Sequence, residues 1–331
     1  TIALSNILFT KPLCKIYEKI FLQVSQGHNN IDIVHVHIGY SVPLACRWIQ
    51  KVPIVLDTHG IAMLRKPQSY SLRDMFAYLT LKVGERRLLQ KCTNFCVIVV
   101  PSPYLKKYLF TTFKIPQEKI YVIPDGINLD EVPQYDGDIV NRLRDVLKLN
   151  NNITIAYAGN PSIYHGFIDL IKAFNIVRKI IDMAKLLLII PKAYKDKILG
   201  RIINLNLKDH VTIIENVPRR KLYYYLYISN VLVLPHRTGT QFDFLYSNKL
   251  LDYIATGKPI VAYALRPVKD LLAKYPLKVL VKPNDPVALA NGITKALDEC
   301  NQRVYGKHYI ENYDWKNISK IIVELYSNLS F

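Results

Sequence analysis

Apolar residues occur along the chain in two patterns, short continuous runs and stripes at helical spacing. A stripe between residues 13 and 24 is typical of an amphipathic helix, and Ser102 followed by Pro103 is typical of a helix start. The short runs in the first half predict four buried strands, at residues 31–38, 52–56, 95–100 and 120–123. Strands that alternate with helices favour a parallel sheet covered on both faces.

The alternation stops at residues 124–138 and then resumes. That stretch is rich in proline, glycine and acidic residues, which predicts a linker. The second half predicts six further strands, at residues 153–158, 186–190, 211–215, 231–234, 259–263 and 277–281. We therefore expect two α/β units with a cleft between them, and ligands at the carboxyl ends of the strands.

Composition and charge narrow the class of protein. Half of the 331 residues are hydrophobic and 21% are charged, which excludes wholesale disorder. No apolar run approaches the roughly 18 residues that a bilayer-spanning helix needs. The formal net charge of +18 favours polyanions, anionic membranes or phosphate-bearing ligands without choosing among them.

The cysteines and the first residues of the chain give information on the cellular compartment. The five cysteines show no metal-type pairing, which favours a reducing, intracellular setting. Residues 1–10 lack the basic start of a secretory signal, so we expect a cytoplasmic protein.

Two loops that precede predicted helices can bind anions. The loop 159–166 follows a strand and leads into a helix, so its free N–H groups can bind a phosphate, with Asn160 or His165 as a further donor. An ordinary βα turn with a surface histidine explains the same pattern. In the second, Ser247 can cap a helix on which Lys249 and Asp252 are neighbours, suited to a phosphate and to ribose hydroxyls. A solvated ion pair is the alternative there.

Histidines supply the remaining candidates in the first half. His59 falls just after the strand 52–56, where an imidazole can donate a hydrogen bond to a sugar, or can simply cap the loop. His35 and His37 share one face of a strand, but no third ligand lies at a suitable spacing along the chain. We therefore interpret His35 and His37 as packed strand residues and predict no metal site.

A basic cluster with interleaved aromatic residues lies between residues 65 and 91. Such helices suit an anionic membrane surface, while RNA or a solvated basic face would explain the same composition. No nucleic-acid-binding module is recognisable, so we expect no nucleic-acid partner. The residues predicted to face a membrane are Arg65, Lys66, Arg73, Lys82, Arg86 and Arg87.

Five segments from about residue 28 to the C-terminus resemble, in order, those of glycosyltransferase family 4, retaining enzymes of the GT-B fold. The resemblance implies two Rossmann-like α/β domains that face each other across a cleft. We expect an acceptor-side domain at 1–135, a nucleotide-sugar domain at 136–312 and a C-terminal helix at 313–331 that crosses back. The segments are residues 31–37, 56–60, 122–128, 231–235 with 247–261, and 313–315.

The resemblance also implies roles for single residues. His59 would be catalytic, next to the transferred sugar, and Asp252 would bind the ribose. His236 and Arg237 would add positive charge near the diphosphate. The other residues expected to bind the donor are Asn160, His165, Gly166, Ser247, Asn248 and Lys249.

The implied activity is transfer of a sugar from a nucleoside-diphosphate donor, without a metal or other cofactor. The acceptor would be lipid-linked or a polysaccharide, and the enzyme would be peripheral on the inner face of the cell membrane. A nucleotide-sugar epimerase of the same fold is an alternative, as is a catalytically impaired binding or scaffold protein.

The chain departs from the family pattern at three places. The family's first phosphate loop has an arginine near Asn160 and a lysine at the position of His165. Its paired glutamates would fall on Phe244 and Asp252, so that only the second acid is kept. We also expect the first βαβ unit of the N-terminal domain, with its glycine-rich acceptor loop, to be absent.

Overall fold

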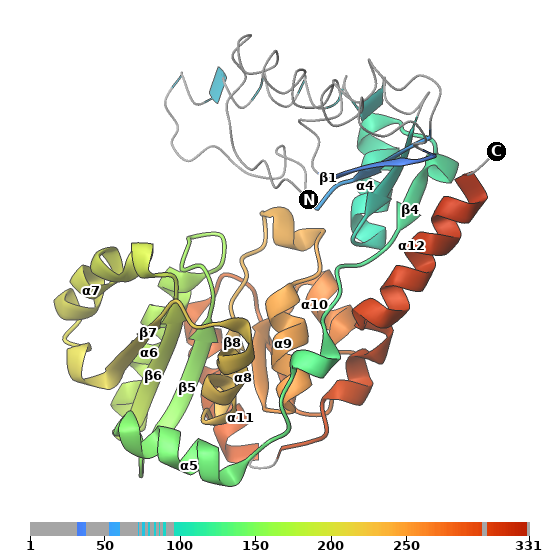
Figure 1. Ribbon diagram of the computed structural model, residues 1–331. Helices are drawn as coiled ribbons and strands as arrows, with labels where there is room; N and C mark the ends of the chain where they lie inside the picture. The colour runs from blue at the N-terminus through green and yellow to red at the C-terminus, as the bar shows by residue number, and fades with distance from the viewer. Residues whose placement is uncertain are drawn as a thin grey trace. The chain divides into compact units, whose positions relative to one another are not determined.

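A computed structural model describes residues 32–37, 53–59, 96–299 and 303–329, together with positions 72, 75, 76, 79, 83, 86, 89 and 90. The chain divides into two compact units, which we treat separately (Figure 1). Unit 1 comprises Thr1–Ile123 with Ile322–Phe331, and unit 2 comprises Pro124–Ile321. Residues before 32 lie outside the described part, so the expected loss of a first βαβ unit is not tested.

Unit 1 contains a four-stranded parallel sheet in the order β1-β2-β3-β4. Its strands are β1 (Val34–His37), β2 (Ile54–Asp57), β3 (Cys96–Val100) and β4 (Ile120–Val122), which confirms the four predicted runs. Helix α4 (Pro103–Phe113) begins as predicted, because Ser102 Oγ accepts a hydrogen bond of 3.1 Å from the Leu105 amide. A short 3-10 turn at Gln117–Lys119 leads into β4.

Unit 2 is built on a six-stranded parallel sheet in the order β10-β9-β8-β5-β6-β7. All six predicted strands are present within two residues of their predicted bounds. From β5 the chain adds strands first on one side and then, beginning with β8, on the other, which makes the β5–β8 pair a topological switch point. The strands are β5 (Ile153–Ala158), β6 (Ala184–Ile190), β7 (Val211–Glu215), β8 (Val231–Leu234), β9 (Ile260–Tyr263) and β10 (Lys278–Val281).

Helices cover both faces of this sheet. Successive residues of β5 point to opposite faces, with Ala156 in one apolar core and Tyr157 in the other. Helices α8 and α9 pack in the first core, and α6 and α11 in the second. The helices of unit 2 are α5 (Gly137–Val146), α6 (Phe167–Ile180), α7 (Lys195–Asn204), α8 (Arg219–Tyr227), α9 (Asn248–Thr256), α10 (Arg266–Leu271) and α11 (Pro286–Glu299). Short 3-10 turns lie at Leu129–Glu131, Lys192–Tyr194, Lys208–His210, Gln241–Asp243 and Lys307–Tyr313.

The predicted linker is packed rather than free. Ile127, Leu129 and Val132 are buried in the unit 2 core, and the Ile127 amide donates to the Tyr313 carbonyl at 2.8 Å. The boundary between the units therefore follows Ile123, instead of residue 135 as expected. Helix α12 (Trp315–Leu329) begins in unit 2, and its residues from Ile322 onward belong to unit 1.

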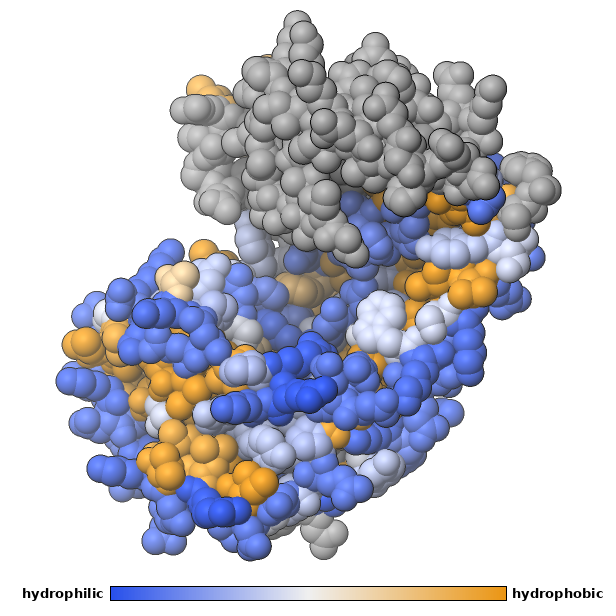
Figure 2. Space-filling model, in the orientation of Figure 1, coloured by the Kyte–Doolittle hydropathy of each residue, from blue (hydrophilic) through white to orange (hydrophobic). Residues whose placement is uncertain are grey.

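The visible surface of unit 2 is mostly polar (Figure 2). Figure 2 shows a visible face of unit 2 that is largely hydrophilic, with smaller hydrophobic patches. None of the helices in the described ranges combines the length and hydropathy that a bilayer-spanning segment requires.

Candidate functional site

A pocket of about 290 Å³ opens at the carboxyl ends of β5, β6 and β7, next to the switch point of unit 2. Gly159 and Pro191, which directly follow β5 and β6, lie in its wall together with Lys249 and Asp252 of α9. The pocket therefore lies where ligands bind in open α/β sheets. Its other lining residues are Ala158, Ile189, Ile190, Asn216, Val217, Leu222 and Tyr253.

Lys249 reaches from α9 to the loop that follows β5. Its Nζ lies 3.2 Å from the Tyr157 hydroxyl and 3.3 Å from His165 Nδ1. The stem of Lys249 runs directly beneath Gly159, where an added Cβ would lie 2.3 Å from Lys249 Cε. The fold thus brings together the two predicted anion-binding stretches, and burial lowers the pKa of Lys249 to about 7.

The two histidines beside Lys249 are uncharged at neutral pH. His165 Nδ1 lies 3.2 Å from His236 Nε2, and His236 stacks on Phe242 with ring centroids 3.7 Å apart. Burial, and then the charge of Lys249, lowers the pKa of His165 to about 3 and that of His236 well below its ordinary value. This argues against His236 as a source of positive charge for a diphosphate, and leaves Lys249 as the cation of this cluster.

The loop between β5 and α6 is shaped by close approaches of the backbone. Gly166 has φ +70°, and a Cβ there would lie 1.7 Å from the Pro235 carbonyl oxygen, so only glycine fits. No side chain caps the start of α6. Asn160 donates from Nδ2 to the Tyr194 hydroxyl at 3.0 Å, while its Oδ1 is buried without a partner among the described residues. The loop therefore keeps one buried acceptor, Asn160 Oδ1, without a partner among the described residues.

Asp252 is buried and holds two partners on one oxygen. Arg219 Nη2 and the Tyr223 hydroxyl both donate to Asp252 Oδ1 at 2.8 Å. Burial raises the pKa of the Asp252 carboxyl, although Arg219 and Tyr223 oppose the shift. The alternative of a solvated ion pair with Lys249 is wrong, because both side chains are drawn inward to other partners.

Three further predicted residues of unit 2, Ser247, Asn248 and Arg237, do not line this pocket. Ser247 occupies the cap position of α9 without a side-chain capping bond, and Asn248 is exposed at the first turn. Arg237 lies with Nε 3.6 Å from Asp169 Oδ2 and 3.3 Å from Asn284 Oδ1. The charge of Arg237 is thus partly balanced within the protein.

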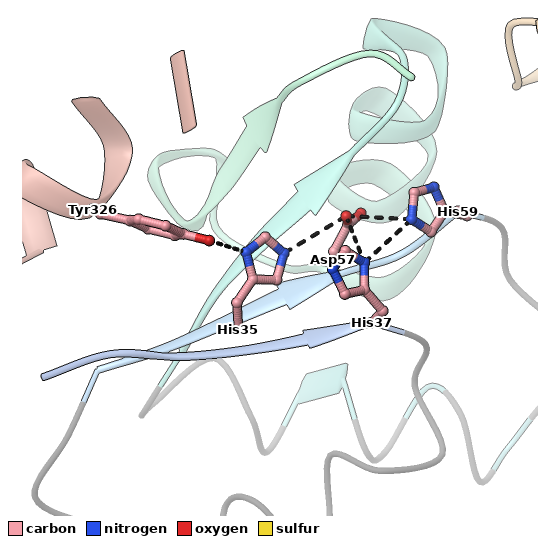
Figure 3. A network of polar contacts seen from close by, with 5 residues as sticks. All are labelled: His35, His37, Asp57, His59 and Tyr326. Carbon is pink, nitrogen blue, oxygen red and sulfur yellow. Dashed lines mark hydrogen bonds and ion pairs between the residues drawn. The ribbon is translucent and has the colours of Figure 1, made fainter. Parts of the chain in front are cut away.

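A second cluster lies in unit 1, at the carboxyl ends of β1 and β2 (Figure 3). Asp57 Oδ2 lies 3.6 Å from His35 Nε2, 3.1 Å from His37 Nδ1 and 3.3 Å from His59 Nε2. His35 Nδ1 in turn is hydrogen-bonded to the hydroxyl of Tyr326 from α12.

Burial opposes ionisation of Asp57, but hydrogen bonds from His35 and His59 outweigh it, so its pKa lies well below the ordinary value. The carboxylate is therefore charged at neutral pH. Burial lowers the pKa of His37, although Asp57 opposes the shift. The predicted catalytic residue His59 thus belongs to a charged, hydrogen-bonded group rather than to a simple loop cap.

Of the six residues predicted to face a membrane, only Arg86 is described, and it is exposed. Arg65, Lys66, Arg73, Lys82 and Arg87 lie outside the described residues. Around Arg86 the described positions are helical and carry exposed apolar side chains at helical spacing: Leu72, Met75, Phe76, Leu79 and Val83.

Sequence reasoning missed several partners in both clusters. Asp57 was not matched with His35 and His37, because it comes from a neighbouring strand, and Arg219 lies 33 positions before Asp252. One signal was available for Asp57. It directly precedes Thr58 and His59 at a strand end, where side chains of adjacent parallel strands converge.

Family models match most of the chain. The model described as "Glycosyl transferases group 1" matches residues 140–313, and that described as "Glycosyltransferase Family 4" matches residues 12–131. An uncharacterized glycosyltransferase of Methanocaldococcus jannaschii is 23% identical over 316 residues, which cover 91% of this chain and 76% of that protein. The D-inositol 3-phosphate glycosyltransferase of Corynebacterium urealyticum is 32% identical over 83 residues, which cover 24% of this chain and 20% of that protein.

Solved structures share the fold at low identity. Sucrose-phosphate synthase from Thermosynechococcus elongatus has a TM-score of 0.75 at 21% identity, covering 98% of this chain and 80% of its own. HepE of Anabaena, in complex with UDP-glucose, has a TM-score of 0.71 at 16% identity, covering 98% and 86%. The two parallel-sheet units and these likenesses establish the GT-B fold, and the group 1 match over residues 140–313 shows that the chain belongs to the glycosyl transferases group 1 family.

Proposed function

We propose that this protein is a retaining hexosyltransferase that moves a sugar from a nucleoside-diphosphate sugar to a lipid-linked or polysaccharide acceptor. The observation that carries the proposal is that Gly159, Lys249 and Asp252 line one pocket at the switch point of unit 2, while Lys249 also lies 3.3 Å from His165 of the 159–166 loop. HepE, of the same fold, has been solved with UDP and with UDP-glucose, which supports a nucleotide-sugar donor.

In this proposal the nucleotide binds along the pocket wall. Asp252 accepts hydrogen bonds from the ribose hydroxyls, and both of its described protein contacts fall on Oδ1, which leaves Oδ2 for the ligand. The diphosphate binds Lys249 and the amides at the starts of α6 and α9, with Asn160, His165, Gly166, Ser247 and Asn248 around it. Asn160 Oδ1, which has no described partner, can then accept a hydrogen bond from a hydroxyl of the donor sugar.

The chemistry requires the bond between the sugar's anomeric carbon and the diphosphate oxygen to break, while the acceptor oxygen bonds to the same carbon. For retention, the acceptor attacks from the face that the diphosphate leaves. Negative charge grows on the departing diphosphate, and Lys249 with the helix dipoles stabilises it without a metal. Arg237 can contribute further positive charge, because its backbone amide donates a hydrogen bond to the Tyr164 carbonyl of the same loop.

His59 is the proposed catalytic residue of unit 1. Asp57 accepts a hydrogen bond from its ring, which fixes the orientation of the imidazole and increases its basicity. The other ring nitrogen can then contact the sugar. Removal of His59 should therefore reduce turnover more than donor affinity.

The exposed apolar helix positions around Arg86 support a peripheral membrane site for a lipid-linked acceptor. Leu72 and Phe76 are 91% and 73% exposed, and the same segment of sequence is rich in lysine and arginine. An apolar stripe flanked by basic residues suits the interface of an anionic leaflet. We accordingly propose that the protein acts at the cytoplasmic face of the membrane.

Incubation with a panel of nucleoside-diphosphate sugars tests the proposal. We expect one donor to release its nucleoside diphosphate only when a glycan or lipid-linked acceptor is present. Conversion of the donor without acceptor would instead favour an epimerase, and a donor that binds but never reacts would favour an impaired binding protein. Asp252→Ala should lose donor binding by calorimetry, whereas Asp209→Asn, at an exposed acid of the same unit, should keep it.

A further inference from the structure

Unit 1 brings together four side chains that commonly ligate metals, and the proposed sugar transfer uses only one of them. His35, His37 and Asp57 each place one ligand atom within 4.8 Å of the other two. His59 adds a third imidazole, with its Nε2 3.4 Å from His37 Nδ1. Figure 3 shows the three rings arranged around the Asp57 carboxylate.

The separations of the Asp57 oxygen from the three ring nitrogens are close to those between ligands of a tetrahedral ion. Ligands bound at about 2.0–2.1 Å in a tetrahedron lie about 3.3–3.4 Å from one another. The distances from Asp57 Oδ2 to the three ring nitrogens are 3.1, 3.3 and 3.6 Å, and that between His37 and His59 is 3.4 Å.

The sheet holds these ligands in place before any ion arrives. β1 and β2 are parallel, with His37 opposite Asp57 in the register, and His35 is two residues before His37 on the same face. His59 lies two residues beyond Asp57. Because β2 is fully buried, the backbone that carries Asp57 has little freedom to move.

Tyr326 supplies the outer support that metal-binding histidines usually have. Its hydroxyl is hydrogen-bonded to His35 Nδ1, which directs the other nitrogen, Nε2, toward Asp57. His35 Nε2 is buried and lies 3.6 Å from Asp57 Oδ2. A bound cation would use the lone pair of this atom.

We propose that unit 1 binds one divalent transition-metal ion of the zinc class through His35, His37 and Asp57, with His59 as the fourth ligand. Three imidazoles and one carboxylate suit zinc, cobalt or nickel, whereas magnesium and calcium prefer oxygen ligands. The ion has no part in the departure of the diphosphate. It would bind His59 through Nε2, so the other ring nitrogen can still make the contact with the sugar that we propose.

Metal titration of the full chain, without donor or acceptor, tests this site independently of enzyme activity. Protein freed of metal with a chelator is titrated with Co²⁺ and with Zn²⁺ in competition with a chromogenic chelator. We expect one ion per chain and the visible absorption of tetrahedral Co²⁺. Thiolate ligation by the cysteines would add a near-ultraviolet charge-transfer band, and its presence would overturn the assignment.

Matched variants locate the ion. His37→Ala and Asp57→Asn should each weaken Zn²⁺ binding at least tenfold, while His308→Ala, at an exposed histidine of unit 2, should bind as the wild type does. Circular dichroism confirms that each variant is folded, and the His37 side chain, 56% exposed, is the safer substitution. Binding equal to wild type in both ligand variants would overturn the site, as would no binding by the wild type.

Tyr326→Phe separates a positioning role from a structural one. Loss of such an outer contact weakens metal binding by about 10–100-fold in known sites. We expect weaker Zn²⁺ binding by this variant with an unchanged melting temperature of the metal-free protein. Metal affinity equal to that of the wild type would remove Tyr326 from the site.

Discussion

Lys249 Nζ lies 3.3 Å from His165 Nδ1, although the two residues are 84 positions apart in the chain. The side chains of both residues are cations when they are protonated. Burial instead keeps the imidazole neutral and lowers the pKa of Lys249 to about 7, so the cluster carries less than one full positive charge at neutral pH. Binding of an anion should therefore increase the positive charge of this cluster, and that change can be measured.

Donor binding should take up a proton above pH 7. A bound diphosphate stabilises the charged form of Lys249 and so raises its pKa above the value of about 7 in the free protein. Affinity should therefore be insensitive to this group below pH 7 and fall as the pH rises, by up to about tenfold per unit. Calorimetry at pH 8 in buffers of different ionisation enthalpy measures the proton uptake.

Lys249→Met provides the control for this titration. It removes the titrating amine but keeps the unbranched stem of the side chain. Residual donor binding by this variant should show no proton uptake at pH 8. Uptake equal to that of the wild type would assign the titration to another group and contradict the role of Lys249.

Gly159→Ala should displace Lys249. Gly159 has φ +114°, and the added Cβ would lie 2.3 Å from Lys249 Cε and 2.7 Å from Nζ. The lysine must therefore leave its place beside His165, and the backbone is strained by about 1–3 kcal/mol. We expect donor affinity to fall and the free energy of unfolding to decrease, measured by calorimetry and by chemical denaturation.

Gly200→Ala is the matched substitution. Gly200 lies within α7, and no other atom would come within 4 Å of a new Cβ. Alanine there should stabilise the helix by about 0.5–1 kcal/mol and leave donor affinity unchanged. If the two variants bound donor equally well, the placement of Lys249 beneath Gly159 would not matter for binding.

The strands were predictable because parallel strands are buried on both faces and so form continuous apolar runs. The run at 153–158 coincides with β5, and 211–215 with β7. The packed linker was not predictable in the same way. Ile127 and Leu129 are isolated among prolines, glycines and acids, and only the presence of Tyr313 and the unit 2 core makes them core residues.

The candidate site was predictable where one loop or one helix turn carries it. Lys249 and Asp252 share a helix, and residues 160–166 share a loop, so their spacing alone indicated phosphate and ribose contacts. Contacts between neighbouring strands could not be predicted from the sequence, since His35 contacts Asp57 only because of the register of β1 and β2. The burial of His236 could not be predicted from the sequence either, and burial is what keeps its imidazole uncharged.

His59→Ala should reduce turnover far more than donor affinity. The imidazole is bonded to the Asp57 carboxylate, and the proposed role of His59 concerns the sugar rather than the nucleotide. General acid–base or orienting histidines commonly contribute about 10²–10⁴-fold to rate. Steady-state kinetics with the identified donor should show a lower kcat with a KM for donor within a few fold of wild type. His308→Ala serves as the control, and an unchanged kcat in His59→Ala would make this histidine structural.

Charge reversal at Arg86 and Arg87 should weaken binding to anionic vesicles. Arg86 is exposed, and the apolar residues around it, including Leu72 and Phe76, are exposed as well. Each basic residue near an anionic surface contributes about 1 kcal/mol, so reversal of two charges should reduce vesicle pelleting by more than tenfold at low salt. The test uses vesicles with and without phosphatidylserine, and the matched variant Lys197→Glu with Arg201→Glu reverses two exposed charges on α7. Weak pelleting of both double variants would indicate a response to net charge alone, whereas equal pelleting of all proteins would remove the membrane from the proposal.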